Sequence, residues 1–431
     1  MSSASLLLCH RLPFPPNKGD KIRSHALLKH LAERGPVHVA CFIDDPEDLQ
    51  YRDDVRRLAG GKCLFEPVDK ATKWLRAIDA VIRGEAVTTA FFSSSAMQTW
   101  IRELVATEDI RSAIVFGSAM VPYLLKHHAL CRRAIFDMVD VDSDKWRQYA
   151  ESSAGPKRWI FAREAMSIAK LEREAARAFG RTLLVSPFEA ETFRHLAPES
   201  AARIDSLSNG VDLRFFSPGS FAKPFPPDEL AIVMTGHMDY QPNCDGALWL
   251  ARNVAPLLLA EFPNAHFYFV GANPPAALRG IAGPRTTVTG RVNDVRPYIQ
   301  AANVIVAPLL IARGVQNKVL EAMAMQKCVV ATRAATRALA VESGRQLWIA
   351  DNARSFADAI AAAIRGPDRQ EVAANARRYV EQHHDWSTLF SKLDAALARL
   401  AKGSTAQGTT LSSLCAATSL PDAAEMGGVQ A

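Results

Sequence analysis

The amino-terminal part of the chain alternates between short apolar runs and an amphipathic stretch. Leu6–Cys9 predicts a buried strand, Ile22–Arg34 has the apolar spacing of a helix, and Val37–Ile43 predicts the next strand. A strand, a helix and a strand in so few residues form a βαβ unit, whose strands run parallel because the helix carries the chain back. Crossover helices cover the faces of such a sheet, so we expect an α/β protein.

The alternation recurs in two blocks. Between them, Asn209-Gly210 has strong turn chemistry, and residues 217–227 carry four prolines, which is typical of a linker. A chain of 431 residues also exceeds the size at which one hydrophobic core keeps growing. We therefore expect two doubly wound, Rossmann-like domains with a ligand site in the cleft between them. The further strands expected are Ala113–Phe116, Ala134–Met138, Thr182–Val185, Leu230–Thr235, His266–Val270, Thr286–Thr289, Val304–Ala307 and Cys328–Ala331, and the further helices are Trp159–Phe179, Ala247–Glu261, Asp294–Ala301 and Asn317–Met325.

Three boundaries follow from this pattern. The first domain is expected over residues 1–207 and the second over residues 208–385. A last helix, at about residues 386–402, is expected to pack back on the first domain. Residues 403–431 are rich in Ser, Thr, Ala and Gly with few large apolar side chains, which predicts a disordered tail.

Composition excludes several classes of protein. No apolar run approaches the ~20 residues that span a bilayer, and Ser5–Cys9 is too short for a secretory signal, so we expect a cytoplasmic protein. The seven cysteines are scattered without a Cys-x-x-Cys pair, which argues against a zinc site. A net charge of +6 is modest for this length, and no basic stripe interleaved with aromatics indicates nucleic-acid binding.

The segment Ile311–Met325 carries the strongest chemical signal. It follows a strand and opens a helix, whose start offers free N–H groups and partial positive charge to an anion. Gly314 lets the backbone approach a phosphate closely, and Arg313 and Lys318 have the charge to bind a diphosphate. Glu321 lies on the same helix face as Lys318, where a carboxylate can accept both hydroxyl hydrogens of a ribose. The alternative is an exposed helix in which Lys318 and Glu321 form a surface pair contributing ~0.2–0.5 kcal/mol.

Several segments resemble the family 4 retaining glycosyltransferases. They are Lys318–Thr332, Ser208-Asn-Gly-Val-Asp212 with the following Phe216-Ser-Pro, and Val288–Tyr298. The stretches His10–Ser24 and Phe136–Ser143 resemble the subgroup associated with exosortase/PEP-CTERM exopolysaccharide systems. The similarity runs in consistent order over about residues 5–400.

The resemblance implies a GT-B fold. We expect a transfer with retention of anomeric configuration, and we expect no metal or other cofactor. A nucleotide-sugar donor (a UDP- or GDP-sugar) would bind the carboxyl-terminal domain, and a saccharide or lipid-linked acceptor the amino-terminal one. Glu321 matches the ribose-binding second glutamate of the family's E-x7-E pair. The first glutamate is replaced by Arg313, which is assigned to the diphosphate instead.

The resemblance also nominates further residues. Arg313, Lys318 and Glu321 are the candidate catalytic residues. Gly19 lies in a loop that reaches the donor phosphate in such enzymes, or simply precedes a helix that Asp20 caps. His237 faces the donor phosphates, or is a structural histidine. Asp137 and Asp140 are acceptor-side candidates, or cap the next helix, as Asp142-Ser-Asp144 does. The full donor-binding set is Gly19, His237, Arg291, Val292, Gly314, Val315, Gln316 and Asn317.

Other functions and contacts stay open at this stage. A nucleotide-sugar epimerase shares the fold, and the Arg313 substitution keeps a non-catalytic nucleotide-binding scaffold possible. Peripheral contact with the inner face of the membrane is a separate hypothesis. It rests on basic and aromatic residues, namely Lys145, Trp146, Arg147, Lys157, Arg158, Trp159 and Arg163.

Overall fold

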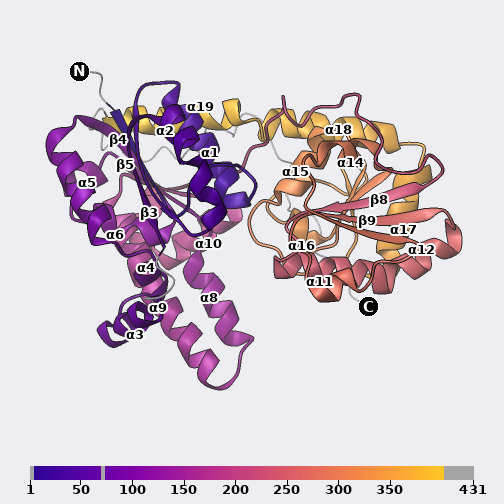
Figure 1. Ribbon diagram of the computed structural model, residues 1–431, viewed down its shortest axis with the longest axis horizontal. Coiled ribbons are helices and arrows are strands. Elements are labelled where there is room, and N and C mark those ends of the chain that lie inside the picture. The colour runs from indigo at the N-terminus through magenta and orange to yellow at the C-terminus, as the bar shows by residue number, and fades with distance from the viewer. Residues whose placement is uncertain (1–3, 69–72, 402–431) are drawn as a thin grey trace, which may run out of the picture.

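A computed structural model describes residues 4–68 and 73–401 of the chain. It contains two parallel sheets, which lie side by side in the long direction of the molecule, each with helices on both faces (Figure 1). The prediction of two doubly wound α/β domains is confirmed.

The first sheet has seven strands. Their spatial order is β3-β2-β1-β4-β5-β6-β7, which places the first strand of the chain inside the sheet, where β2 and β4 pair with its two edges. Successive side chains of the first strand point to opposite faces. Leu6 and Leu8 enter one half of the core, and Leu7 and Cys9 enter the other. The strands are β1 (Ala4–Cys9), β2 (Val37–Ile43), β3 (Gly60–Pro67), β4 (Ile110–Phe116), β5 (Ala134–Val139), β6 (Arg181–Leu184) and β7 (Ile204–Ser206).

Helices cover both faces of this sheet and extend beyond it. α8 and α9 form a helical hairpin that projects away from the sheet at the bottom of Figure 1, with α3 beside its base. The helices are α1 (Gly19–Ala32), α2 (Arg52–Ala59), α3 (Lys73–Arg83), α4 (Val87–Phe91), α5 (Ser95–Thr107), α6 (Pro122–Leu125), α7 (His128–Cys131), α8 (Asp142–Glu151), α9 (Gly155–Ala178) and α10 (Pro187–Leu196).

The second sheet has six strands in the order β10-β9-β8-β11-β12-β13. Its strands are β8 (Leu230–Thr235), β9 (Ala265–Val270), β10 (Thr286–Gly290), β11 (Val304–Ala307), β12 (Val329–Ala331) and β13 (Trp348–Ile349). Its helices are α11 (Gln241–Trp249), α12 (Ala255–Glu261), α13 (Ala276–Arg279), α14 (Arg296–Ala301), α15 (Asn317–Ala324), α16 (Arg333–Thr336), α17 (Ala353–Arg365) and α18 (Arg369–His383).

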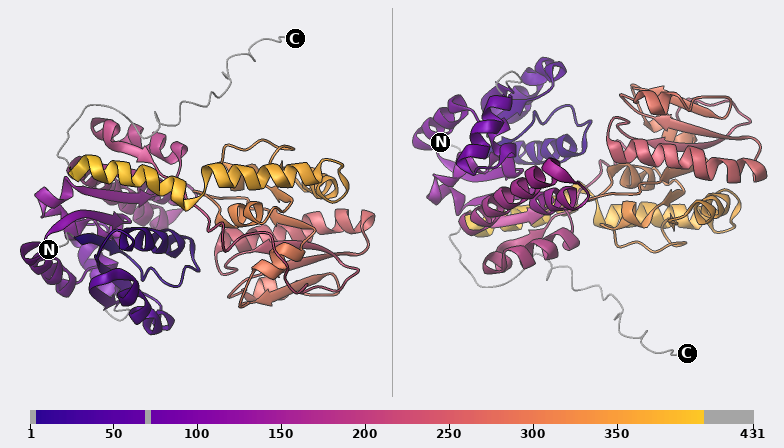
Figure 2. Two further views of the ribbon diagram at one scale, coloured as in Figure 1. Left: turned by 90° about the horizontal axis from the view of Figure 1, so that it is seen from above. Right: turned by 90° about the horizontal axis from the view of Figure 1, so that it is seen from below.

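The chain crosses between the domains twice, and the two crossings touch. A Cβ on Gly210 would lie 2.6 Å from the ring of Trp386, so only glycine fits there. The buried imidazole of His384 bonds the carbonyl oxygen of Asn209 through Nδ1 at 2.9 Å. α19 (Trp386–Ala401) then runs back over the first domain, where Leu389 joins the apolar core (Figure 2).

Some expected elements have different bounds. The helix expected at Ala247–Glu261 begins at Gln241 and passes through a π-helical turn, Leu250–Val254, before α12. β3 is absent from the sequence prediction because it is an edge strand without a fully buried residue, so it carries little apolar signal. The predicted tail, residues 403–431, lies outside the described residues. None of the described helices is both long and apolar enough to cross a membrane.

Candidate functional site

The loop between β11 and α15 carries the predicted anion site. Gly314 has φ +59°, and a Cβ there would lie 2.9 Å from Oδ1 of Asp140, so both backbone conformation and space require glycine. α15 begins at Asn317, where the sequence predicted it. No side chain caps its first turn, because the N-cap Gln316 donates to the carbonyl oxygen of Arg313 instead. The helix start is therefore open to a ligand.

Lys318 points from α15 back toward the end of β8. Its Nζ lies 2.5 Å from Oδ1 of Asn243, whose Nδ2 donates to the carbonyl oxygen of His237. A Cβ on Gly236 would lie 2.8 Å from the same Nζ, so the glycine makes room for the ammonium group. Burial lowers the pKa of Lys318 to about 8. An ammonium group with so little hydration interacts strongly with an anion.

Glu321 lies one turn further along α15 and is partly buried. Burial raises its pKa to about 7, against the opposing effect of Lys318. Within the described part of the chain, no hydrogen bond or ion pair reaches its carboxylate, although Lys318 is close enough to affect its pKa. The alternative of an exposed Lys318–Glu321 surface pair is therefore wrong. The carboxylate is available to a ligand.

The amino-terminal domain supplies the facing wall. Gly19 is the first residue of α1, and a Cβ there would lie 3.7 Å from Nδ2 of Asn317, so the starts of α1 and α15 meet across the domain boundary. His237 bonds the carbonyl oxygen of Asn17 through Nε2 at 2.7 Å. Its Nδ1 is buried, makes no hydrogen bond within the described residues and lies 3.9 Å from Oδ1 of Asp239. Two helix starts thus converge on one place, which favours an anion there.

The charged residues beside Gly19 are mostly engaged inside the domain. Asp20 is not the N-cap of α1, since Lys18 occupies that position; the Asp20 carboxylate instead accepts a hydrogen bond from Arg11 at 2.7 Å. Lys21 is buried and lies 2.6 Å from Asp48. These side chains shape the loop rather than bind a ligand.

Asp137 is not an acceptor-side residue. It is 1% exposed, and both its carboxylate oxygens accept hydrogen bonds from Arg23, at 2.7 and 2.9 Å. The same guanidinium donates to the carbonyl oxygen of Leu207 near the domain crossing. The prediction is corrected: Asp137 belongs to a buried structural ion pair.

Asp140 and Arg313 face each other across the boundary beside Gly314. Burial, with the nearby charges of Glu189 and Asp142, raises the pKa of Asp140 to about 7, and its Oδ1 is buried without a described partner. Arg313 donates from Nη2 to Asp144 at 2.9 Å, but its Nη1 is likewise buried and unpartnered in the described residues. A lone acceptor and a lone donor suit a ligand with both hydroxyl and anionic oxygens.

The Asp142-Ser-Asp144 triplet does not cap α8. The N-cap is Val141, Asp142 accepts a hydrogen bond from Ser118, and Asp144 turns to Arg313. Among the residues that the structure describes, no group of three His, Cys, Asp or Glu side chains is placed to hold a metal ion.

The remaining donor-side candidates lie at the rim or in the core. Arg291 is exposed and lies 3.6 Å from Glu47 of the other domain. Val292 packs against the second domain's core, and the side chain of Val315 is buried in it, so these two offer a ligand only their backbone. Asn317 accepts a hydrogen bond from Asn209 at 3.2 Å.

Sequence reasoning missed His10. It follows β1 directly, stacks on Phe116 with ring centroids 5.7 Å apart, and lies 3.3 Å from Asp20 through Nε2. Its Nδ1 is buried and has no partner in the described ranges. A histidine placed directly after a buried strand, at the sheet edge where ligands bind, was the available signal.

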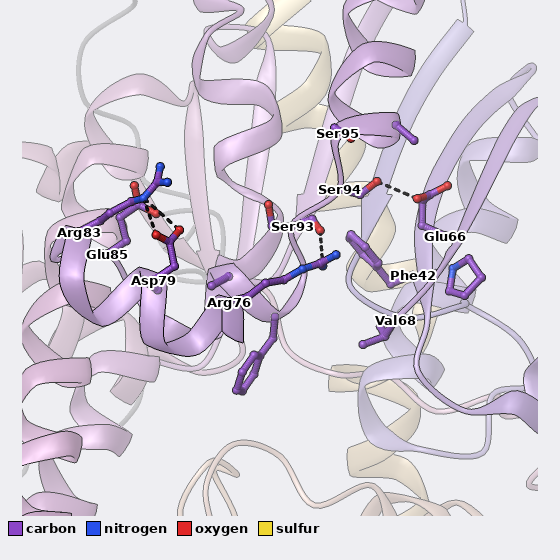
Figure 3. Close-up of a pocket in the computed structure, with 15 residues that line it drawn as sticks. Phe42, Glu66, Val68, Arg76, Asp79, Arg83, Glu85, Ser93, Ser94 and Ser95 are labelled. Atoms are coloured by element: carbon purple, nitrogen blue, oxygen red, sulfur yellow. Dashed lines mark hydrogen bonds and ion pairs between the residues drawn. The ribbon is translucent and has the colours of Figure 1, made fainter. Parts of the chain in front are cut away.

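A polar pocket of about 460 Å³ opens at the carboxyl ends of β2 and β3 (Figure 3). Arg76 of α3 donates to the carbonyl oxygen of Ser93 at 2.7 Å, and Ser94 donates to Glu66 at 2.7 Å. Phe92 connects the pocket with the loop after β1, since its ring contacts both Phe42 of the pocket wall and His10.

The second domain of the chain is similar to a known protein family. Residues 229–365 match the family model of the group 1 glycosyl transferases. No curated protein matches the sequence. The family match confirms the predicted enzyme class, a glycosyltransferase.

Solved structures share the whole fold. Sucrose-phosphate synthase from Thermosynechococcus elongatus superposes with a TM-score of 0.70 at 17% identity, covering 93% of this chain and 100% of that chain. HepE from Anabaena in complex with UDP-glucose gives 0.62 at 13% identity, covering 91% and 99%. The trehalose 6-phosphate synthase from Burkholderia multivorans gives 0.64 at 11% identity, covering 94% and 100%. At these identities the likeness establishes the GT-B fold alone.

Proposed function

We propose that this protein transfers a sugar, with retention of anomeric configuration, from a nucleotide diphosphate-sugar to a saccharide or lipid-linked acceptor. A UDP-sugar is the favoured donor, because HepE of the same fold was crystallised with UDP-glucose. A role in exopolysaccharide biosynthesis is part of the proposal and rests on the sequence resemblance.

One observation carries the proposal. The starts of α1 and α15 face each other. Beside them, two buried atoms, Nη1 of Arg313 and Oδ1 of Asp140, have no hydrogen-bond partner among the described residues. The pyrophosphate would lie between the helix starts, bound by Lys318 and by Nη1 of Arg313. The ribose hydroxyls would donate to the Glu321 carboxylate.

In the proposed reaction, the bond between the anomeric carbon and the diphosphate oxygen breaks, and the acceptor oxygen bonds to that carbon on the same face. The proton of the acceptor hydroxyl passes to an oxygen of the leaving diphosphate. Lys318, Arg313 and the helix starts stabilise the charge that develops there, which is usually the largest contribution to catalysis. This positive charge comes from the protein itself, so no metal enters the proposal. Asp140 and His10 lie on the opposite wall, where they would contact hydroxyl groups of the transferred sugar or the acceptor.

The test is calorimetric titration with UDP-, GDP-, ADP- and dTDP-sugars. We expect one nucleotide to bind the wild type, and both Lys318→Ala and Glu321→Ala to weaken that binding by about tenfold or more, as for a lost charge-assisted hydrogen bond. The exposed Arg345→Ala in the same domain is the control. Unchanged affinity in both site variants would remove the donor from this junction.

Product analysis separates the alternatives. Incubation of the donor without an acceptor would yield an epimerised sugar if the protein were an epimerase. Transfer of a radiolabelled sugar into a saccharide or lipid fraction supports the transferase, and nuclear magnetic resonance of the product reports its anomeric configuration.

A further inference from the structure

α3 turns an apolar face to solvent. Leu75, Ile78 and Ile82 are 68%, 58% and 78% exposed. They occupy positions i, i+3 and i+7 and therefore share one side of the helix. Ala77 and Ala80 on the inner side are buried. A helix of a soluble domain normally turns its apolar face inward, so this orientation indicates a surface that contacts something else.

Polar contacts from α9 hold α3 in this orientation. Nη2 of Arg163 accounts for three hydrogen bonds, to the carbonyl oxygens of Ala80, Val81 and Glu85 at 2.8, 3.1 and 2.9 Å. Arg163 therefore caps the end of α3. The sequence had nominated it for membrane contact, but its guanidinium is engaged within the protein. Because these hydrogen bonds and the buried Ala77 and Ala80 attach α3 to the domain, its exposed apolar side chains are not needed for that attachment.

The exposed surface continues onto α9. Trp159 and Met166 flank Arg163 on the same side of the helix and are 62% and 69% exposed. Next to Trp159, at the tip of the hairpin, Lys157 and Arg158 are exposed and form no ion pair within the described residues. Figure 1 shows α3 and the hairpin together below the first sheet, opposite α19.

Trp146 and Arg147, which the sequence also nominated for a membrane, are engaged within the protein. Trp146 packs against Tyr149 and Phe161. Arg147 pairs with Asp144 and Glu151. The lipid-facing set is thus smaller than the sequence suggested, and it includes α3, which the sequence did not nominate.

We propose that the surface formed by Leu75, Ile78, Ile82, Trp159 and Met166, with Lys157 and Arg158 at its edge, rests on an anionic membrane leaflet. Apolar side chains enter the headgroup region, the tryptophan takes the interfacial position that suits its ring, and the two cations face lipid phosphates. A second copy of the chain fits less well, because its equivalent surface carries the same positive charge and offers no anionic partner to Lys157 and Arg158.

The polar pocket lies beside this apolar surface, on a neighbouring side of α3. Arg76, Asp79 and Arg83 of α3 line the pocket (Figure 3), while Ile78 and Ile82 are exposed to solvent. One helix therefore borders both the proposed lipid-facing surface and a polar cavity. This arrangement admits the saccharide end of an acceptor whose lipid end stays in the bilayer, a conclusion that rests on the proposed function.

The experiment is flotation of the full-length protein with vesicles of phosphatidylcholine, with and without phosphatidylglycerol. The wild type is expected to float with the anionic vesicles. Ile78→Ser/Ile82→Ser and Lys157→Glu/Arg158→Glu are expected to lower the bound fraction by about tenfold, as lost apolar contact and lost phosphate attraction predict. Leu257→Ser and Arg285→Glu, exposed on the second domain, are the matched controls and are expected to float like the wild type.

The proposal would be overturned if all variants floated equally or if the wild type did not float. A concentration-dependent dimer of the wild type that Ile78→Ser/Ile82→Ser abolishes would also overturn it. Nucleotide-sugar titration of the same variants keeps the two proposals apart. The surface variants should bind donor normally without floating, whereas Lys318→Ala should float but lose donor affinity.

Discussion

Arg313 and Asp144 meet across the boundary between the domains, with Nη2 2.9 Å from Oδ2. Asp140 lies on the same wall, where burial raises its pKa and the nearby charge of Arg313 opposes that shift. A glutamate at position 313, which the resembling family carries, would face these carboxylates at short range. The arginine is thus complementary to the acidic start of α8, so its presence does not indicate a lost function.

Removing the two partners of this ion pair should have different effects on donor binding. Arg313→Ala is expected to weaken the affinity for UDP-glucose by about tenfold or more, because a charge-assisted hydrogen bond to the diphosphate is lost. Asp144→Ala should leave the affinity unchanged or increase it, since it frees the guanidinium. Calorimetry measures both. Equal losses in the two variants would instead assign the pair a purely structural role.

Donor affinity should depend on pH through Lys318 and Glu321. Burial raises the pKa of Glu321 to about 7, so its carboxylate forms only as the pH rises through that value; burial lowers the pKa of Lys318 to about 8, so its charge is lost above it. Affinity should therefore peak between these values. Glu321→Gln should abolish the acidic limb of the profile and Lys318→Met the alkaline limb.

The same shift of Glu321 affects stability with a definite sign. Between pH 4.5, its ordinary pKa, and about 7, the folded protein holds a proton that the unfolded chain has released. This group's contribution to the free energy of unfolding therefore falls as the pH rises through that window. Urea unfolding of the wild type and of Glu321→Gln, measured across this pH window, should give free energies of unfolding whose difference grows with pH. A constant difference would contradict the burial of the Glu321 carboxyl group.

Asp137→Ala should act on stability and not on acceptor binding. Its partner Arg23 is 1% exposed, so the variant leaves a buried charge unpaired, at a cost of about 3–5 kcal/mol in the free energy of unfolding. Chemical denaturation measures this cost. In a double-mutant cycle, Arg23→Met/Asp137→Ala should recover part of the loss. If Asp137→Ala instead kept full stability and changed the KM for the acceptor, Asp137 would have to be assigned to the acceptor site.

Gly314→Ala should impair donor binding more than backbone strain alone explains. Gly344 has a similar positive φ but no atom within 4 Å of a Cβ, so Gly344→Ala measures the strain by itself, about 1 kcal/mol. At Gly314 the added methyl group also meets Asp140. Adding Asp140→Ala to Gly314→Ala should remove this steric contact and the part of the defect that it causes. Equal effects of the two glycine variants on stability, with donor affinity unchanged, would refute the close approach.

The candidate site could be proposed from the sequence because it depends on local features. A glycine turn after a buried strand, a helix start and cations at fixed spacing all lie within Ile311–Met325, and Lys318 and Glu321 were identified from that segment alone. The roles of residues that depend on a distant partner could not be predicted in this way. Asp137 looked like a ligand-facing carboxylate, but its partner is 114 positions away, and Arg313 finds Asp144 at a separation of 169.

The sequence by itself determined the doubly wound α/β architecture, because the period of apolar residues is a local property of each strand and helix. Tertiary structure decided which charged side chains pair with one another inside the protein and which remain available to a ligand. It also decided that the apolar side of α3 faces outward, since Arg163 and not the hydrophobic core fixes that helix. Burial and pairing of a side chain are properties of the packed molecule, and no local pattern encodes them.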